Sequence, residues 1–315
     1  MNLSAICAKL KEPIPKPTPS TSPHTKSVVD CAPEVLEHVQ KLRHAHNYRV
    51  TLSGIALNIT FYTSSPEINP TAIDTVLRIL NFLLPHRKCA SAAVFDIYWC
   101  QHLKVLPLQG PLSPVHINTG YAYRCGKHLV VYRQEEWVKV FIHECMHYFG
   151  MDTDLDVSPQ VQAAFHSVAS IELSESYCEL WARILHCCLV SVLCGENVAE
   201  LLRVEQDFAY FQTAKVLDYA GTTYEEVLQG KTQGYREKTN VFAYFAVTCA
   251  LLHSYRTFPL TFSNLPSFPG LVLRCYKEPT LLRKLKAAEQ HVLREKATNS
   301  RLYKTTRMTI TDMCL

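Results

Sequence analysis

Hydrophobic residues in the N-terminal half of the chain follow the alternation of β-strands. The segments with this pattern, rich in β-branched and aromatic residues, are 48–63, 90–99, 103–108, 116–123 and 128–133. Alternating apolar and polar positions bury one face of a strand, so the pattern predicts strands. The last two segments flank a turn that contains Gly126, which predicts a hairpin.

The spacing of amphipathic helices occurs at intervals before and between these strands and throughout the C-terminal half. Apolar residues three and four positions apart occur at 33–44, 70–84, 135–149, 158–168, 171–193, 197–219, 239–255 and 279–297. Asn69 stands where an N-cap is expected, and Gly150 stands where a helix is expected to end. The sequence thus predicts an α+β fold, with a small mixed N-terminal half and a mostly helical C-terminal half.

The two ends of the chain differ in composition from its centre. Five prolines lie between positions 13 and 23, and proline lacks the amide hydrogen that helices and β-ladders use. We therefore expect a disordered, extended tail over residues 1–29, one domain over 30–297, and a basic tail over 298–315.

Positive charge is concentrated near the C-terminus. From Arg274 to Arg307 there are 10 Lys and Arg against 3 Asp and Glu, whereas the whole chain of 315 residues has a net charge of +4. The remainder is slightly acidic and carries no nucleic-acid-binding motif, so a nucleic acid partner is not expected. A basic stretch of this kind is typical of a solvated helix face.

Hydrophobic residues make up 48% of the chain, enough for a large core.

Thirteen cysteines are present, but none of them forms a CxxC pair. The first residues lack the apolar segment of a secretion signal, and the longest uncharged runs fall short of the ~20 residues that span a membrane. These observations predict free thiols, a cytoplasmic or nuclear location and no membrane partner.

One sequence motif is typical of a catalytic metal site. His143, Glu144 and His147 form the sequence HExxH within a predicted helix. Residues four apart share a helix face, so both imidazoles can reach one metal ion while Glu144 lies beside them, next to a metal-activated water. Catalytic zinc usually has three protein ligands and an open position, so a third ligand is required.

Several acids are candidates for that third ligand. After Gly150 the chain has Thr153 where one class of zinc enzymes carries His or Asp, flanked by Asp152 and Asp154. Glu175 and Glu179 lie on one face of the next long helix, where one can bind the metal and the other can orient an imidazole. Glu172 shares that face and is a rival to Glu175.

The combination of HExxH with a following glutamate helix resembles the gluzincin class of zinc metallopeptidases, of which thermolysin is the best-known member. The resemblance implies a zincin-like fold and one Zn²⁺ per chain bound by His143, His147 and Glu175. It also implies that Glu144 is the general base and that Glu179 lies behind a histidine. Residues 118–143 are also similar to uncharacterised predicted metallopeptidases of large DNA viruses.

A zinc-dependent peptidase acting on a peptide or protein substrate is therefore the leading hypothesis. Gluzincins stabilise the oxyanion with a Tyr or His from the helical half, and we prefer Tyr244 to Tyr235 and His253. The strand at 128–133 is a candidate edge for pairing with a peptide. The alternative hypothesis is a catalytically inactive protein of the same fold that uses its basic C-terminal helix for interactions.

Overall fold

The computed structural model describes residues 2–20, 29–89, 93–126, 128–153, 155, 157–166, 170–232, 235–257, 262 and 265–311. The strands are β1 (Thr18–Pro19), β2 (His44–Leu52), β3 (Ile55–Thr63), β4 (Ala93–Tyr98), β5 (Gly120–Ala122) and β6 (His128–Val131). The helices up to the middle of the chain are α1 (Leu3–Leu10), α2 (Pro33–Gln40), α3 (Pro70–Leu83), α4 (Pro114–Ile117), α5 (Trp137–Tyr148), α6 (Pro159–Ala164) and α7 (Leu173–Cys194). They are followed by α8 (Val198–Tyr219), α9 (Tyr224–Leu228), the π-helix η2 (Ala243–Val247), α10 (Thr248–Ser254), α11 (Phe268–Cys275), α12 (Pro279–Ala297) and α13 (Arg301–Lys304).

The described strands form one six-stranded mixed sheet in the order β1-β2-β3-β4-β6-β5. β4 pairs in parallel with both β3 and β6, and the other pairs are antiparallel. The predicted hairpin is confirmed as β5 and β6. The mixed composition is also confirmed, with 54% helix, 13% strand and a mostly helical C-terminal half.

Alternation along the strands gives the sheet two apolar faces. Phe61, Phe95 and Leu129 point into the main core, which they share with α3, α5 and α7. The neighbouring positions Tyr62 and Tyr98 point to the other face, where α2 covers them. Since β6 leads almost directly into α5, the sheet fixes where the helix with the HExxH motif begins.

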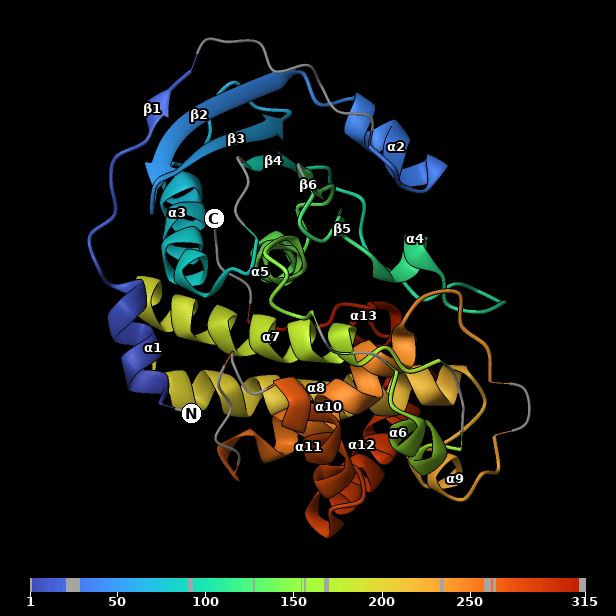
Figure 1. Ribbon diagram of the computed structural model, residues 1–315. Helices are drawn as coiled ribbons and strands as arrows, with labels where there is room; N and C mark the ends of the chain where they lie inside the picture. Colours follow the sequence, from blue (N-terminus) through green and yellow to red (C-terminus); the bar gives the residue numbers. More distant parts are fainter. Residues whose placement is uncertain are drawn as a thin grey trace.

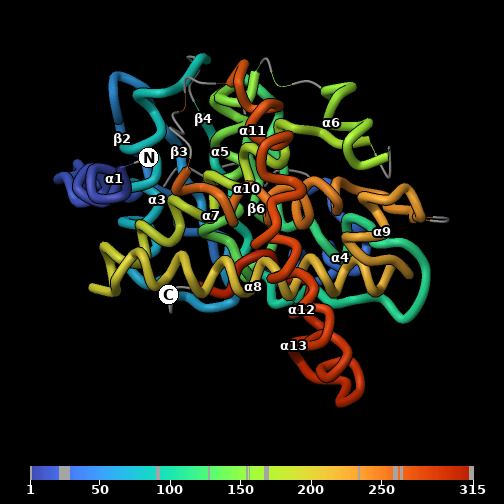
Figure 2. Tube along the Cα trace, turned by 90° about the horizontal axis from the view of Figure 1, so that it is seen from below, coloured from blue at the N-terminus to red at the C-terminus, as the bar shows by residue number. Residues whose placement is uncertain are grey.

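Apart from α2, which covers the other face, the long helices lie in layers below the sheet (Figure 1). α3 and α5 cover its inner face, and α7 crosses beneath α5. α8 packs against α7, and α12 packs against α8, as the view from below also shows (Figure 2). α7 is long and apolar enough to span a membrane, yet 78% of its most apolar window is buried inside the protein. Its hydropathy is accounted for by its position as a central core helix.

The N-terminal segment is not the extended tail that its prolines predict. Leu3–Leu10 is a helix capped by Asn2, whose Oδ1 accepts a hydrogen bond from the amide of Ala5 at 3.1 Å. Leu10 is buried in the main core, and Thr18–Pro19 pairs with β2. The apolar residues before the prolines are spaced for a helix, and the prolines follow the end of this helix and so do not interrupt it. Residues 21–28 lie outside the described part.

The predicted basic tail is also wrong for residues 305–311, which we name the C-terminal strap. Thr306, Met308 and Thr309 are buried. The amides of Met308 and Thr309 both donate to Oε1 of Glu136 at 2.6 Å. Its threonines find hydrogen-bond acceptors inside and Met308 finds space there, whereas Ile310 of the strap and the preceding Arg301 and Lys304 stay exposed. Residues 312–315 lie outside the described part.

Two further predictions are corrected. Residues 103–108 do not form a strand; Val105 makes an isolated bridge with Thr305 of the strap. Cys89 and Cys125 form a disulfide, so the prediction of free thiols is wrong for this pair. The other cysteines in the described residues are free. No Cys-Cys spacing signalled the disulfide, because residues 36 positions apart are brought together by the fold.

The contact between Glu136 and the strap gives a test of the fold. Glu136 is buried, forms an ion pair with Lys104 and accepts two strap amides. Burial alone would raise the pKa of Glu136, but the charges of Lys104 and Lys139 bring it down to about 2. Glu136→Ala leaves a buried cation and two amides without partners, which we expect to cost about 3–5 kcal/mol of unfolding free energy in urea denaturation.

The matched control is Glu200→Ala, which removes a carboxylate whose side chain is 66% exposed and paired only with exposed Arg203 among the described residues. This variant should unfold at the wild-type urea concentration, because exposed ion pairs add little stability. Equal midpoints for both variants would show that the strap is not held through Glu136.

Candidate metal centre

The centre lies where α5 meets α7. α5 carries His143 and His147 one turn apart on the face toward α7, and α7 carries Glu175 in its first turn. The two Nε2 atoms are 3.0 Å apart. Oε2 of Glu175 lies 3.2 Å from Nε2 of His143 and 3.3 Å from Nε2 of His147. Three donor atoms from two helices therefore converge on one point.

These separations fit a small divalent ion. Zinc binds nitrogen at about 2.0–2.1 Å in tetrahedral geometry, which places neighbouring donor atoms about 3.3–3.4 Å apart. The three separations of 3.0, 3.2 and 3.3 Å lie close to that spacing. A set of two imidazoles and one carboxylate also leaves the fourth position open, as in catalytic zinc sites.

Asp152 orients the second histidine. Its Oδ2 lies 2.8 Å from Nδ1 of His147, and the same oxygen accepts a hydrogen bond from Arg124 at 2.8 Å. Gly150 makes this contact possible, because the chain turns there with φ of 65°. A Cβ atom at Gly150 would lie 2.8 Å from the sulfur of Cys89. Asp152, which the sequence offered as a rival ligand, thus contacts the far side of the ring.

Glu179 supports the first histidine. Its Oε2 lies 3.3 Å from Nδ1 of His143. Lys139 donates to both oxygens of Glu179, at 3.1 and 2.8 Å, and Arg183 donates to Oε1 at 2.8 Å. All four side chains are buried. The structure therefore brings Glu179 behind His143, where it faces the nitrogen that points away from the converging donors.

The surroundings lower the pKa of the carboxylate donor and raise the pKa of the two imidazole donors. Burial would raise the pKa of Glu175, but contacts with His143 and His147 hold it below its usual value, so the carboxylate is ionised. Burial lowers the pKa of both imidazoles, yet the surrounding acids outweigh it. Glu175 and Glu179 raise the pKa of His143, and Cys178 and Asp152 raise that of His147.

Glu144 lies beside the donors and faces β5. Gly120 is the close neighbour on that strand, where a Cβ atom would lie 2.7 Å from the carbonyl oxygen of Val130 and 3.2 Å from Cγ of Glu144. The missing side chain thus lets β5 pass directly against α5. Burial raises the pKa of Glu144 despite the nearby imidazoles, which moves it toward the range of a general base.

Tyr244 also reaches the centre. Its ring lies 5.9 Å from that of His143, edge to face. It lies in the π-helix η2, and Ser176 and Thr248 donate to the carbonyl of Ala243 at 3.1 and 2.9 Å. π-Helices often occur at functional sites. Burial and the charges of Glu175 and Glu144 raise the pKa of Tyr244, so the phenol remains a hydrogen-bond donor.

The other candidates lie elsewhere. Tyr235 donates to Glu237 at 2.7 Å, and His253 contacts Tyr210 and Glu278, each at 2.6 Å. Glu172 is the exposed N-cap residue of α7. Thr153 donates to the carbonyl of Gly150 at 2.8 Å, and Asp154 lies outside the described residues.

A second group of potential ligands adjoins the first. His147, Asp152 and Cys178 offer donor atoms within 4.8 Å of one another, and Sγ of Cys178 lies 3.7 Å from Nδ1 of His147. This group uses the opposite nitrogen of His147, which already contacts Asp152 at 2.8 Å. The group of His143, His147 and Glu175 is therefore the better candidate for binding a metal ion.

Comparisons of the chain with protein-family models, curated proteins and solved structures find no match. Function is therefore inferred from the chemistry of the site.

Asp152 gives a direct test of how the centre is supported. Asp152→Ala removes the carboxylate that fixes the ring of His147, and loss of such a contact typically weakens metal binding by about 10–100-fold. Competition with a chromophoric zinc chelator measures this change. Asp207→Ala, which removes an exposed carboxylate on α8, is the control and should bind zinc like the wild type. Equal zinc affinities for the two variants would show that Asp152 does not support the metal centre.

Zinc binding should also release protons. The neighbouring acids raise the pKa of His143 and His147 in the metal-free protein, whereas an imidazole that binds zinc must be neutral. The apparent affinity for zinc should therefore increase as the pH rises through the pKa of these rings. Isothermal titration calorimetry at pH 6.5, in two buffers with different ionisation enthalpies, counts the protons. Identical heats in both buffers would contradict the assigned ligands.

Proposed function

We propose that this chain is a zinc-dependent peptidase with gluzincin-like ligation and a zincin-like fold. The observation that carries the proposal is the convergence of His143, His147 and Glu175 at separations of 3.0–3.3 Å beside Glu144. This combination supports hydrolysis, because it joins a metal site with an open position to a general base.

A bound zinc ion would lower the pKa of a water molecule and polarise the substrate carbonyl. Glu144 accepts the proton of that water and then donates it to the amine that leaves. Its raised pKa suits both steps, because the group must take up and release a proton near neutral pH. Tyr244 donates its phenol hydrogen to the oxygen on which negative charge develops. Asp152 and Glu179 hold the imidazoles in orientation.

The substrate is proposed to bind as an extended peptide along β5. The sequence suggested the strand at 128–133 for this role, but β6 lies between β4 and β5, so that assignment is wrong. β5 is the outermost strand at this end of the sheet, and Gly120 places it against Glu144. A peptide paired with β5 would therefore pass the general base.

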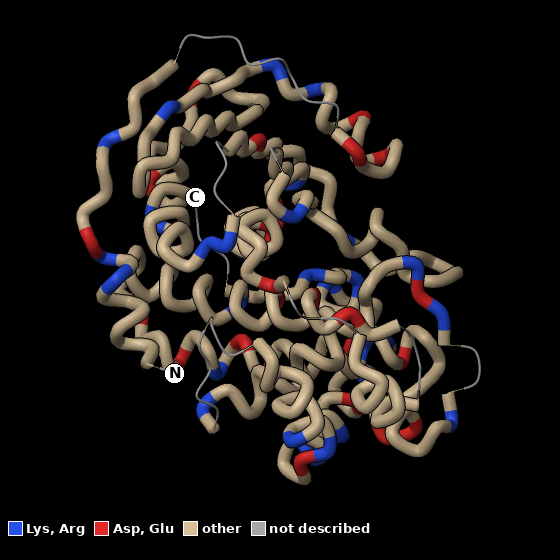
Figure 3. Tube along the Cα trace, viewed as in Figure 1, with Lys and Arg blue, Asp and Glu red and all other residues tan. Residues whose placement is uncertain are grey.

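The basic helix α12 gives little support to the alternative, an inactive interaction protein. Figure 3 shows charges of both signs on α12. Lys296 pairs with Asp218 of α8 at 2.7 Å, and Lys286 pairs with Glu289 at 2.9 Å. These contacts are those of a solvated helix that packs on α8.

Metal analysis of the purified protein tests the ligands. The wild type should retain about one zinc per chain, the usual stoichiometry of such a site. His143→Ala and Glu175→Ala should lose the zinc, whereas the control Glu172→Ala, three residues away on the exposed N-cap, should keep it. If Glu175→Ala retained its zinc, Glu175 would not be a zinc ligand.

Glu144→Gln tests the chemistry separately from the metal. The variant keeps the size of the side chain but cannot accept the proton, so we expect normal zinc content and a loss of about 10²–10⁴-fold in peptide cleavage. A library of internally quenched peptides, with products mapped by mass spectrometry, measures cleavage. Persisting cleavage would show that Glu144 is not the base. A zinc-loaded wild type without cleavage would favour the interaction protein.

A further inference from the structure

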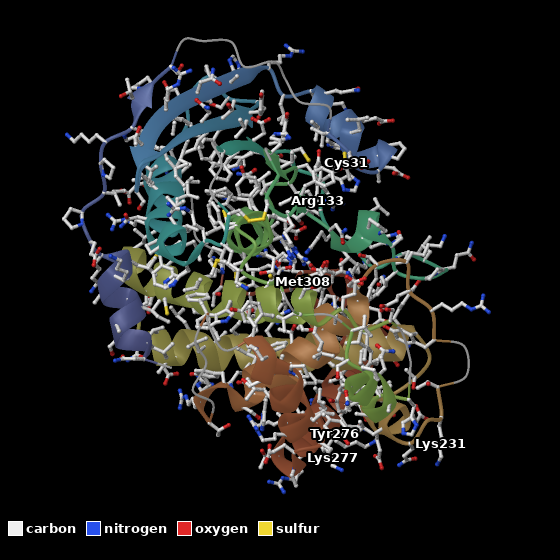
Figure 4. All side chains as sticks on the ribbon, in the orientation of Figure 1. Cys31, Arg133, Lys231, Tyr276, Lys277 and Met308 are labelled. Carbon is white, nitrogen blue, oxygen red and sulfur yellow. A yellow bond between two sulfur atoms is a disulfide. The ribbon has the colours of Figure 1, made fainter. Side chains whose placement is uncertain are left out.

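The C-terminal strap forms part of the wall beside the candidate metal centre. Met308, labelled in Figure 4, lies in the interior where α5 meets α7. Its sulfur lies 3.4 Å from Nζ of Lys139, the residue that donates to Glu179. The strap is fixed on both sides of Met308, because Glu136 accepts its amide and Glu205 accepts the hydroxyl of Thr309 at 2.9 Å.

Met308 lines a small cavity that reaches Glu144 and His143. The other residues of its wall are Ile117, Asn118, Thr119, Gly120, Val140 and Tyr244. The cavity is also lined by Lys104, Lys139 and Glu179. Lys104 forms an ion pair with Glu136, and Lys139 forms one with Glu179, so the positive charge of each lysine is balanced. The surroundings therefore suit an uncharged group.

The cavity has a volume of about 40 Å³. A cavity of about 150 Å³ holds benzene, which has six heavy atoms. On that scale the cavity beside Glu144 takes one or two heavy atoms. The cavity is partly open to solvent, and its enclosed part has no room for an isobutyl or benzyl group. Met308 is the longest flexible side chain in its apolar wall.

One polar group in the wall has no partner. Oγ1 of Thr119 is buried and makes no hydrogen bond within the part of the chain that the structure describes. A buried hydroxyl without a partner is unfavourable unless a ligand or water satisfies it. Because Thr119 lines the cavity, its hydroxyl is the candidate partner for a small polar group that enters there.

We propose that this cavity receives the side chain of the residue that supplies the leaving amine, and that Met308 restricts that residue to Gly, Ala or Ser. The inference rests on the proposed function. Because Glu144 must hand a proton to the leaving amine, the residue carrying that amine lies next to Glu144. The cavity adjoins Glu144, and Met308, from the far end of the chain, forms part of its wall.

Quenched peptides that differ only at this residue (Ala, Ser, Leu or Phe) test the proposal with zinc-loaded protein. The wild type should cleave before Ala and Ser at least ~10–200-fold faster, in kcat/KM, than before Leu or Phe, the range typical of a size-selective pocket. Met308→Ala should raise kcat/KM for the Leu peptide at least about 10-fold relative to the Ala peptide. Met308→Leu, which keeps the volume, should retain the wild-type order.

Thr119→Val gives a second readout that does not depend on enlarging the cavity. It keeps the shape of the side chain and removes the hydroxyl. If Thr119 bonds to the Ser hydroxyl, the wild type should cleave before Ser faster than before Ala. Thr119→Val should lose this difference and keep the discrimination against Leu. Melting temperatures and zinc content identify any variant that has not folded.

The outcomes separate the two proposals. A zinc-loaded wild type that cleaves none of the library would overturn the proposed function. A wild type that cleaves before Leu or Phe as readily as before Ala would overturn the inference and leave the peptidase assignment intact. If folded Met308→Ala showed the wild-type ratio of kcat/KM for the Leu peptide to that for the Ala peptide, the inference would likewise be overturned and the peptidase assignment would stand.

Discussion

Glu179 holds together the two helices that form the candidate metal centre. This carboxylate of α7 is fully buried, and it contacts Lys139 and His143 of α5 as well as Arg183 of its own helix. A buried carboxylate is strongly destabilising unless it is paired, so these contacts favour the rotation of α7 against α5 that pairs Glu179. Glu175 lies one turn earlier on the same face and therefore faces the two imidazoles. The geometry of the ligands thus follows from the pairing of Glu179.

Two glutamates of the centre have opposite environments and are proposed to have opposite roles. The imidazoles keep the pKa of Glu175 low, so it is an anionic donor, whereas burial raises the pKa of Glu144. Side chains of one type acquire distinct functions in this way through their surroundings. The approach of β5 at Gly120 contributes to the burial of Glu144. The sheet thus supports the proposed chemistry as well as the fold.

The sequence predicted the parts of the centre that depend on local spacing. His143 and His147, like Glu175 and Glu179, are four residues apart on helices, and such pairs share a face in any fold. The contact of Asp152 with His147 depends on the turn at Gly150 and was not predicted as an orienting contact. Met308 was missed because the flanking Arg and Lys residues make its segment resemble a solvated tail. Contacts between distant segments leave no periodic signal in the chain.

Cys178 offers the sharpest test of the central assignment, because its sulfur lies 3.7 Å from Nδ1 of His147. X-ray absorption at the zinc edge, recorded on the zinc-loaded protein, distinguishes the two groups of potential ligands. Ligation by His143, His147 and Glu175 predicts a first shell of nitrogen and oxygen only, at about 2.0–2.2 Å. A zinc–sulfur distance of about 2.3 Å would place the ion with Cys178 instead and would contradict the account.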